Sequence, residues 1–245
     1  MNTILIIQSR ARPEMVAGEQ DEYRRAFTGT GFIPVFQSAL DTSLPWNEPA
    51  SIIGDARGVM LAGSGEYDFN GGRDLHDPAR ATSQQILTTL TPFLEYVFAR
   101  DIPTLGICYG HQIIGEWREG KVSNDQTQKK SGSYEVSLTE VGRADPLFMG
   151  MPAVFIAQYG HKDSLTTLPK GAICIATGTN CRYSALKYGS NIYTFQFHPE
   201  LTAEDISKKL SLSPGYLPEG IALTDVIKAS PEASSLIPRF LELLG

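Results

Sequence analysis

The stretch Pro-Thr-Leu-Gly-Ile-Cys-Tyr-Gly-His-Gln, residues 103–112, predicts a strand that turns sharply into a helix around Cys108. Gly106 and Gly110 flank the cysteine, and glycine tolerates a tight turn in which a Cβ would clash. A cysteine at the first turn of a helix meets free backbone N–H groups and the positive end of the helix dipole, which favour a thiolate. Cysteine is also common as a small core residue, so a reactive role needs a partner elsewhere in the chain.

Around this segment, short apolar runs alternate with helical patterns. Strands are predicted at residues 3–7, 32–36, 58–61 and 103–107, and helices at residues 14–27, 81–100 and 109–117. This alternation is typical of a parallel sheet with helices on both faces. The chain is therefore expected to adopt an α/β fold of the flavodoxin-like kind, with a mostly parallel open sheet flanked by helices.

The second half of the chain has a different pattern. Strands are predicted close together at residues 134–138, 153–157, 172–176, 183–187 and 192–195, and helices at residues 203–210 and 232–244, on either side of a loop at 213–220. Such tight spacing leaves no room for crossover helices, so some strands should be antiparallel. We expect them at one edge of the main sheet or in a small side sheet. No long linker interrupts residues 1–245, which predicts a single domain.

Composition excludes several classes of protein. The 245 residues contain 21 Lys and Arg against 27 Asp and Glu, a net charge of −6, and 42% are hydrophobic. These values are ordinary for a globular protein, and the acidic balance argues against nucleic-acid binding. No apolar run is long enough to span a membrane, and the run at residues 4–7 is too short for a secretory signal peptide. Three cysteines without a CxxC pair favour a reducing, cytoplasmic setting.

A cysteine nucleophile needs a histidine base that a third group orients. The four histidines are His76, His111, His161 and His198. His198 is the best candidate because it follows the predicted strand at 192–195, so it should project from the same sheet edge as Cys108. Glu200 lies two residues further on, and the intervening proline fixes the backbone so that the carboxylate can reach the imidazole. We expect His111, on the helix after Cys108, to pack or to shape the pocket.

Three segments taken together resemble the class I glutamine amidotransferases, and most closely the glutaminase domain of GMP synthetase and its free-standing relatives. They are Leu-Ala-Gly-Ser-Gly at 61–65, Gly-Ile-Cys-Tyr-Gly-His-Gln at 106–112 and Phe-Gln-Phe-His-Pro-Glu at 195–200. Further similarity lies at residues 145–148, 160–163 and 168–169. The resemblance covers most of residues 1–205, and the remainder from about 205 is a C-terminal extension of the usual fold.

The resemblance implies a Cys-His-Glu triad that acts on the side-chain amide of glutamine. Cys108 would attack the amide carbon, His198 would pass a proton to the leaving ammonia, and Glu200 would orient His198. Water would then hydrolyse the γ-glutamyl thioester to glutamate. Loss of any member of such a unit removes most of its rate.

The resemblance also implies residues around this triad. The oxyanion hole would use backbone N–H groups of Tyr109 and of the Gly63–Ser64 turn, and Gln112 would contact the substrate. The family turn often has a second glycine where this chain has Ser64, but a main-chain donor survives that change.

The loop at residues 66–78 is longer and more acidic than the family pattern, and it is placed to rim the pocket. Its Asp68, Asp74, His76 and Asp77 have a spacing that fits no defined metal loop, so we expect no metal site. We also expect no cofactor.

Three functions stay open at this stage. In the first, the chain hydrolyses glutamine, and since no P-loop is present, the ammonia either passes to a synthetase site on a separate partner chain or is released to water. In the second, it is a free-standing γ-glutamyl peptidase that uses the same triad on other γ-glutamyl amides. In the third, it is a non-catalytic binding or regulatory subunit, which the intact Cys108, His198 and Glu200 argue against. The predicted ligand is glutamine or a γ-glutamyl amide, without nucleic acid or membrane.

Overall fold

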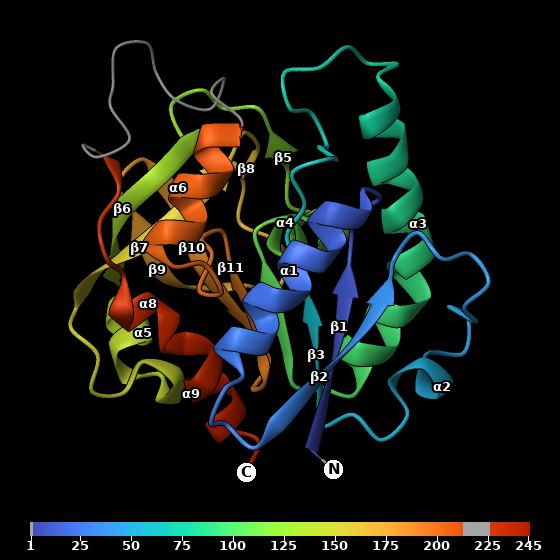
Figure 1. Ribbon diagram of the computed structural model, residues 1–245, viewed down its shortest axis with the longest axis horizontal. Helices are drawn as coiled ribbons and strands as arrows, with labels where there is room; N and C mark the ends of the chain where they lie inside the picture. Colours follow the sequence, from blue (N-terminus) through green and yellow to red (C-terminus); the bar gives the residue numbers. More distant parts are fainter. Residues whose placement is uncertain (1, 213–225) are drawn as a thin grey trace.

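A nine-stranded mixed sheet forms the centre of the computed structural model, which describes residues 2–212 and 226–245 (Figure 1). Its strands are β1 (Asn2–Gln8), β2 (Phe32–Ser38), β3 (Gly58–Leu61), β4 (Thr104–Ile107), β6 (Lys130–Leu138), β7 (Val154–His161), β9 (Ile173–Gly178), β10 (Cys181–Tyr188) and β11 (Ile192–Phe195). They lie in the order β2-β1-β3-β4-β11-β10-β9-β6-β7. A separate two-stranded sheet pairs β5 (Val122–Ser123) with β8 (Ser164–Leu165).

Five neighbouring strands, β2, β1, β3, β4 and β11, are parallel and form what we call the parallel half of the sheet. Residues 4–7 of β1 are all buried, because helices cover both faces here and a strand buried on both sides reads as a continuous apolar run. Gly106 of β4 lies opposite Leu61 of β3 and Thr194 of β11. The carboxyl ends of these three strands therefore meet at one edge.

The remaining strands, β10, β9, β6 and β7, pair antiparallel and form the antiparallel half. The expectation of antiparallel strands in the second half of the chain is confirmed. Of the two predicted locations these strands take the first, since they extend one side of the main sheet, and β5 and β8 form a small side sheet besides.

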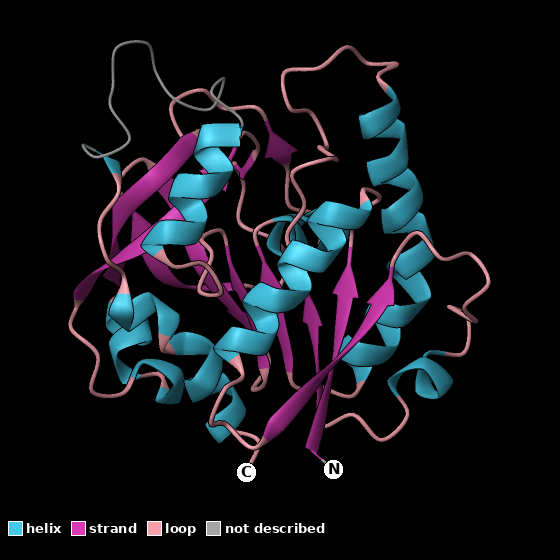
Figure 2. Ribbon diagram, in the orientation of Figure 1, coloured by secondary structure: helices cyan, strands magenta, loops and turns pink. Residues whose placement is uncertain are grey.

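Helices pack on the two faces of the sheet (Figure 2). They are α1 (Pro13–Ala26), α2 (Pro49–Ile53), α3 (Pro78–Ala99), α4 (Tyr109–Trp117), α5 (Glu140–Ala144), α6 (Ala203–Leu212), α8 (Pro231–Ser234) and α9 (Leu236–Glu242), with a 3-10 turn η1 (Pro146–Phe148). Alternate residues of a strand point to opposite faces. Accordingly Ile4 and Ile6 belong to the core under α1 and α9, and Leu5 and Ile7 to the core under α3 and α4.

The prediction of a single helix over residues 232–244 is wrong in one respect. The structure has two helices in this region, α8 and α9, which meet at Ser235. Pro238 lacks an N–H, so it cannot close a helical hydrogen bond to the carbonyl four residues earlier. The loop predicted at residues 213–220 lies outside the described residues. Within the described part of the chain, no helix combines the length and apolar character needed to cross a bilayer.

Candidate active site

Cys108 occupies the turn between β4 and α4, as its flanking glycines predict. Its backbone has φ 50° and ψ −96°, a left-handed conformation that is rare for a residue with a side chain. A Cβ on Gly110 would lie 2.2 Å from the carbonyl oxygen of Leu61, and one on Gly106 would lie 3.0 Å from that of Gly110. Both glycines are therefore required for β3, β4 and α4 to approach closely. Strain of this kind, about 1–3 kcal/mol, is concentrated at functional sites.

His198 and Glu200 lie just beyond the end of β11, and both are buried. The His198 ring nitrogen Nδ1 is 2.6 Å from Oε1 of Glu200, so the carboxylate fixes the orientation of the imidazole. The backbone N–H of His198 donates to the carbonyl oxygen of Gln158 in β7, at 2.8 Å. This stretch of chain is thus held both by its own carboxylate and by the antiparallel half of the sheet.

The structure brings His198 to Cys108 although the two residues are 90 positions apart in the sequence. A Cβ placed on Gly63 would lie 3.1 Å from Cε1 of His198 and 3.7 Å from Cβ of Cys108, so all three residues surround one point. Burial lowers the pKa of His198, but the negative charges of Glu200 and Cys108 and the hydrogen bonds to both raise it to about 10. The imidazole is therefore protonated at neutral pH and has a proton to give.

The Gly63–Ser64 turn follows β3 directly, beside the first turn of α4. The Ser64 hydroxyl accepts hydrogen bonds from the backbone N–H groups of Glu66 and Tyr67, at 3.2 and 3.3 Å. The serine that replaces the second glycine of the family pattern thus shapes the loop that follows it. Tyr109 is the first residue of α4, and N–H groups of a first helical turn have no acceptor within the helix.

Gln112 faces a small pocket that adjoins Cys108. Its Nε2 donates to the carbonyl oxygen of Asp163 at 2.7 Å and to Oε1 of Gln196 at 3.3 Å. The residues that line this pocket are Ser64, Tyr67, Asp68, Cys108, Gln112, Gly160, His161, Lys162 and Asp163. They come from three places, the loop after β3, the start of α4 and the end of β7.

Two further histidines are buried near the centre of the site. Nδ1 of His111 is 2.8 Å from the hydroxyl of Thr194 in β11, which agrees with the packing role predicted for it. His161, at the end of β7, lines the pocket next to Cys108. Burial lowers the pKa of each histidine to about 3, so both rings are neutral at working pH. Sequence reasoning gave His161 no role, although residues 160–163 already belonged to the resemblance.

The acidic loop at 66–78 uses its carboxylates to hold itself together and its backbone N–H groups to dock on the site. Asp68 forms an ion pair with Arg73 at 2.7 Å, and Asp77 caps α3 through the N–H of Ala79 at 2.8 Å. The carboxylate of Asp163 accepts the N–H groups of residues 70 and 71 at 2.6 and 2.7 Å. Among the described residues, no group of three or more His, Cys, Asp or Glu side chains is arranged to hold a metal ion.

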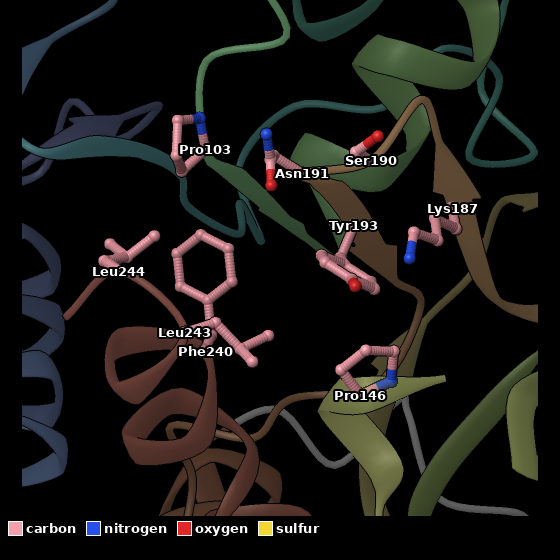
Figure 3. Close-up of a pocket in the computed structure, with 9 residues that line it drawn as sticks. All are labelled: Pro103, Pro146, Lys187, Ser190, Asn191, Tyr193, Phe240, Leu243 and Leu244. Atoms are coloured by element: carbon pink, nitrogen blue, oxygen red, sulfur yellow. The ribbon is translucent and has the colours of Figure 1, made fainter. Parts of the chain in front are cut away.

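A second cavity lies at the opposite end of the same strands (Figure 3). Pro103 and Asn191 on its wall immediately precede β4 and β11. Phe240, Leu243 and Leu244, near the end of the chain, also line it. The described residues on its wall include neither a cysteine nor a histidine. The chemistry assembled at the carboxyl edge therefore has no counterpart here.

Comparison with known proteins shows which family the chain resembles. The model of the family described as "Glutamine amidotransferase class-I" matches residues 78–211, more than half of the chain. A GMP synthase [glutamine-hydrolyzing] from Thermosipho melanesiensis is 36% identical over 121 residues, which are 49% of this chain and 23% of that protein. The corresponding protein from Streptococcus pyogenes serotype M5 is 33% identical over 122 residues, 48% of this chain and 23% of that protein. The aligned part thus spans about a quarter of these curated relatives.

Solved structures share the fold over nearly the whole chain. A glutamine amidotransferase from Thermotoga maritima superposes with a TM-score of 0.69 at 18% identity, over 99% of this chain and 97% of that one. A glutamine amidotransferase from Methylobacillus flagellatus gives a TM-score of 0.68 at 19% identity, over 100% of this chain and 93% of that one. At such identities the likeness concerns the fold, a mostly parallel sheet flanked by helices.

Proposed function

This chain belongs to the class I glutamine amidotransferase family, and we propose that it hydrolyses the side-chain amide of glutamine to glutamate and ammonia through a cysteine thioester. One observation carries the proposal. A strained cysteine at a helix N-terminus lies beside a buried imidazole that is itself bonded to a carboxylate. Three neighbouring parallel strands, β3, β4 and β11, end at this point, which is where α/β sheets bind ligands.

In the first half of the proposed reaction, the Cys108 thiolate attacks the γ-amide carbon of glutamine. The carbonyl π electrons move to oxygen and give a tetrahedral oxyanion. His198, protonated through its partnership with Glu200 and Cys108, donates its proton to the amide nitrogen. The C–N bond then breaks, ammonia leaves, and a γ-glutamyl thioester stays on Cys108.

In the second half, the now neutral His198 removes a proton from water as it attacks the thioester carbonyl. The C–S bond breaks, glutamate leaves, and the thiolate is restored. The backbone N–H groups of Tyr109 and of the Gly63–Ser64 turn are proposed to bind the oxyanion in both halves. One such donor is typically worth about 3–4 kcal/mol of barrier. Gln112 is proposed to border the bound substrate.

We extend the proposal to the organisation of the chain. Residues 1–245 would form one domain in which the part from about 205 is an extension, since Leu236, Ile237 and Phe240 pack into the same core as β1. A synthetase site on a separate partner chain would consume the ammonia. The three cysteines are free thiols, which supports a reducing, cytoplasmic setting.

The test is a comparison of substrates with the purified chain. Glutamine and γ-glutamyl dipeptides are supplied separately, and ammonia, glutamate and released amino acid are measured, with Cys108→Ser as the blank. Ammonia and glutamate from glutamine support the proposal. Cleavage of the dipeptides alone would replace it by γ-glutamyl peptide hydrolysis. If neither substrate is turned over, with any co-purifying partner chain present as well, the catalytic proposal fails.

A further inference from the structure

Helix α1 is fastened to the segment that carries Glu200. Nη2 of Arg25, in α1, is 3.5 Å from the backbone carbonyl oxygen of Glu200, and it also forms an ion pair with Asp205 of α6. A second ion pair joins the same two helices, with 2.8 Å between Nζ of Lys209 and Oε1 of Glu22. Helix α1 therefore lies close to the loop that holds the carboxylate of the proposed triad.

A buried ion pair fixes α1 to the loop after β1. Nε of Arg10 donates to Oε1 of Glu19 at 2.7 Å, and the two side chains are only 6% and 1% exposed. The other oxygen of Glu19, Oε2, accepts from Nε2 of Gln8 at 2.8 Å. Both oxygens of this carboxylate are therefore engaged, and the residues of α1 around it have a defined position.

A buried donor and a buried acceptor in this region have no hydrogen-bond partner among the described residues. They are the hydroxyl of Tyr23, in α1, and Oε2 of Glu200. The same is true of Nε2 of His161, which belongs instead to the pocket next to Cys108. A carboxylate oxygen accepts and a phenol donates, and buried groups of both kinds are normally paired.

Electrostatics place the Tyr23 hydroxyl near Glu200. Burial raises the pKa of the Tyr23 phenol well above its usual value, and the negative charge of Glu200 raises it more than any other charge does. Because such an effect falls with distance, the carboxylate lies close to the phenol, which stays protonated and remains a donor. The carboxylates of Glu19 and Glu22 are already engaged, so Oε2 of Glu200 is the acceptor that this donor can serve.

We propose that Tyr23 is a positioning residue of the triad, whose hydroxyl donates to Oε2 of Glu200, directly or through one water, while Oε1 holds the imidazole of His198. Hydrogen bonds of an active site often tighten only when the substrate is bound. A carboxylate held at both oxygens keeps its charge and its orientation, and so does the imidazole bonded to it. The inference rests on the proposed function, since it assumes that His198 transfers the protons of the reaction.

Tyr23→Phe removes the hydroxyl alone, because phenylalanine keeps the ring that packs edge-on against Phe36, with 6.4 Å between the ring centroids. The kcat for glutamine should fall about 5–20-fold, the usual range for one hydrogen bond to a charged group. KM should stay within about twofold, since the change affects the alignment of the triad and not the binding of glutamine. An unchanged kcat would overturn the inference.

A double variant shows whether the hydroxyl acts through the carboxylate. Glu200→Ala leaves no oxygen for the hydroxyl to hold, so adding Tyr23→Phe to it should lower kcat less than about twofold further. Losses that multiply would mean that Tyr23 acts through packing, and they would overturn the inference.

Tyr188→Phe is the matched control. The hydroxyl of Tyr188 is also buried without a partner among the described residues, but this side chain belongs to the core under α3 and α4. The control should leave kcat and KM within about twofold of the unmodified protein. A loss equal to that of Tyr23→Phe would mean that removal of any buried hydroxyl slows the reaction, which contradicts the inference.

A measurement without turnover separates this inference from the proposed function. The NMR signals of the His198 ring, assigned by their loss in His198→Asn, respond to the protonation of the neighbouring Glu200. As the pH is lowered, their transition should occur about 0.5–1 pH unit higher in Tyr23→Phe than in the unmodified protein or in Tyr188→Phe. A carboxylate that loses a hydrogen-bond donor takes up a proton more readily.

This shift supports the inference even if the unmodified protein hydrolyses no glutamine, a result that would sink only the proposed function. Identical titrations in Tyr23→Phe and the unmodified protein overturn the inference, and turnover of glutamine then leaves the proposed function standing.

Discussion

The parallel and antiparallel halves of the sheet contribute differently to the site. In the parallel half, Gly63, Cys108 and His198 follow the ends of the adjacent strands β3, β4 and β11. In the antiparallel half, β7 is the outermost strand, yet Gln158 pairs with His198. This half of the sheet therefore curls back until its edge strand meets the loop after β11.

Aromatic side chains pack together where β7 meets the loop after β11. The ring of Tyr159 in β7 lies 5.9 Å from that of Phe197, and its hydroxyl bonds to Ser184 of β10. Phe197 in turn stacks on Phe195 with ring centroids 4.9 Å apart. The comparison teaches that parallel strands place the proposed reacting groups, whereas the curled antiparallel strands supply a wall, at His161 and Asp163, and an anchor for His198.

The largest expected effect comes from the nucleophile of the parallel half. Cys108→Ala should abolish glutamine hydrolysis, a fall of at least about 10⁵-fold, because no group is left to form the thioester. The midpoint of urea unfolding should change little. Ammonia release and the unfolding midpoint are measured on the same preparation, and full activity in this variant would remove Cys108 from the mechanism.

His198→Asn should cost slightly less, about 10³–10⁴-fold in kcat. Asparagine keeps the backbone bond to Gln158 but has no transferable proton. Circular dichroism checks that the loop is still folded. A loss below tenfold would mean that the antiparallel anchor matters and the imidazole does not.

Glu200→Gln is the next in size, with kcat lowered roughly 10²–10³-fold. Glutamine has nearly the same shape but no charge, and the charge of Glu200 is one cause of the raised pKa of His198. The pKa of His198 should therefore fall in this variant. Proton NMR of the imidazole as a function of pH measures that shift, and an unchanged pKa together with an unchanged rate would refute the orienting role.

The pH dependence of the free energy of unfolding distinguishes His111 and His161 from His198. His111 and His161 have a pKa of about 3 in the folded protein, below the ordinary value of 6.5. The unfolded chain therefore binds more protons than the folded one between these values. Their contribution is complete above pH 6.5 and is lost as the pH falls toward 3, by up to about 1.4 kcal/mol per pH unit for each ring.

In His111→Gln, the free energy of unfolding should fall less steeply as the pH is lowered from 7 to 5. Urea unfolding at pH 7, 6 and 5 measures this dependence. His198 has the opposite sign, because its folded pKa of about 10 lies above 6.5. Its contribution is complete below pH 6.5 and is lost as the pH rises through 10. If the free energy of unfolding falls equally between pH 7 and pH 5 in His111→Gln and in the unmodified protein, His111 is not buried as a neutral ring.

The smallest effect is expected in the antiparallel half, at its buried cysteine. Burial raises the pKa of the Cys181 thiol to about 12, so it stays protonated and inert. Cys181→Ser should lower the free energy of unfolding by about 1–2 kcal/mol, since a hydroxyl replaces an apolar thiol in a packed site. Activity should stay within about twofold. A larger fall would mean that the contact between β7 and the loop after β11 transmits packing changes from Cys181 to His198.

Sequence reasoning located the parallel half almost residue by residue. β3, α4 and β11 have the predicted bounds, β4 differs by one residue at its start, β1 is one residue longer at each end, and β2 ends two residues later than predicted. Apolar runs and bracketing glycines are local signals, and consecutive strand–helix units have few alternative arrangements. By contrast α2, α5, β5 and β8 were not predicted, because elements of two to five residues have too short a pattern to be distinguished from loops.

The site, too, has features that the sequence predicts and features that it does not. The turn at Cys108, the approach of His198 and its bond to Glu200 follow from residues near the ends of buried strands. The role of Ser64 in shaping the next loop, the docking of that loop on Asp163 and the unpartnered nitrogen of His161 do not, because each depends on atoms that are close only in space.

The amino-acid sequence by itself determined the alternation of strands and helices, the strained turn and the identity of three chemically suited side chains. Periodicity and glycine placement act over a few residues, so they can be read from a linear order. Only the tertiary structure decided that the edge strand β7 returns to His198 and that Asp68, His161 and Lys162 share one pocket with Cys108. Such neighbours lie 40 to 94 residues apart in the sequence, and their meeting depends on how the sheet curls and packs, which no local pattern specifies.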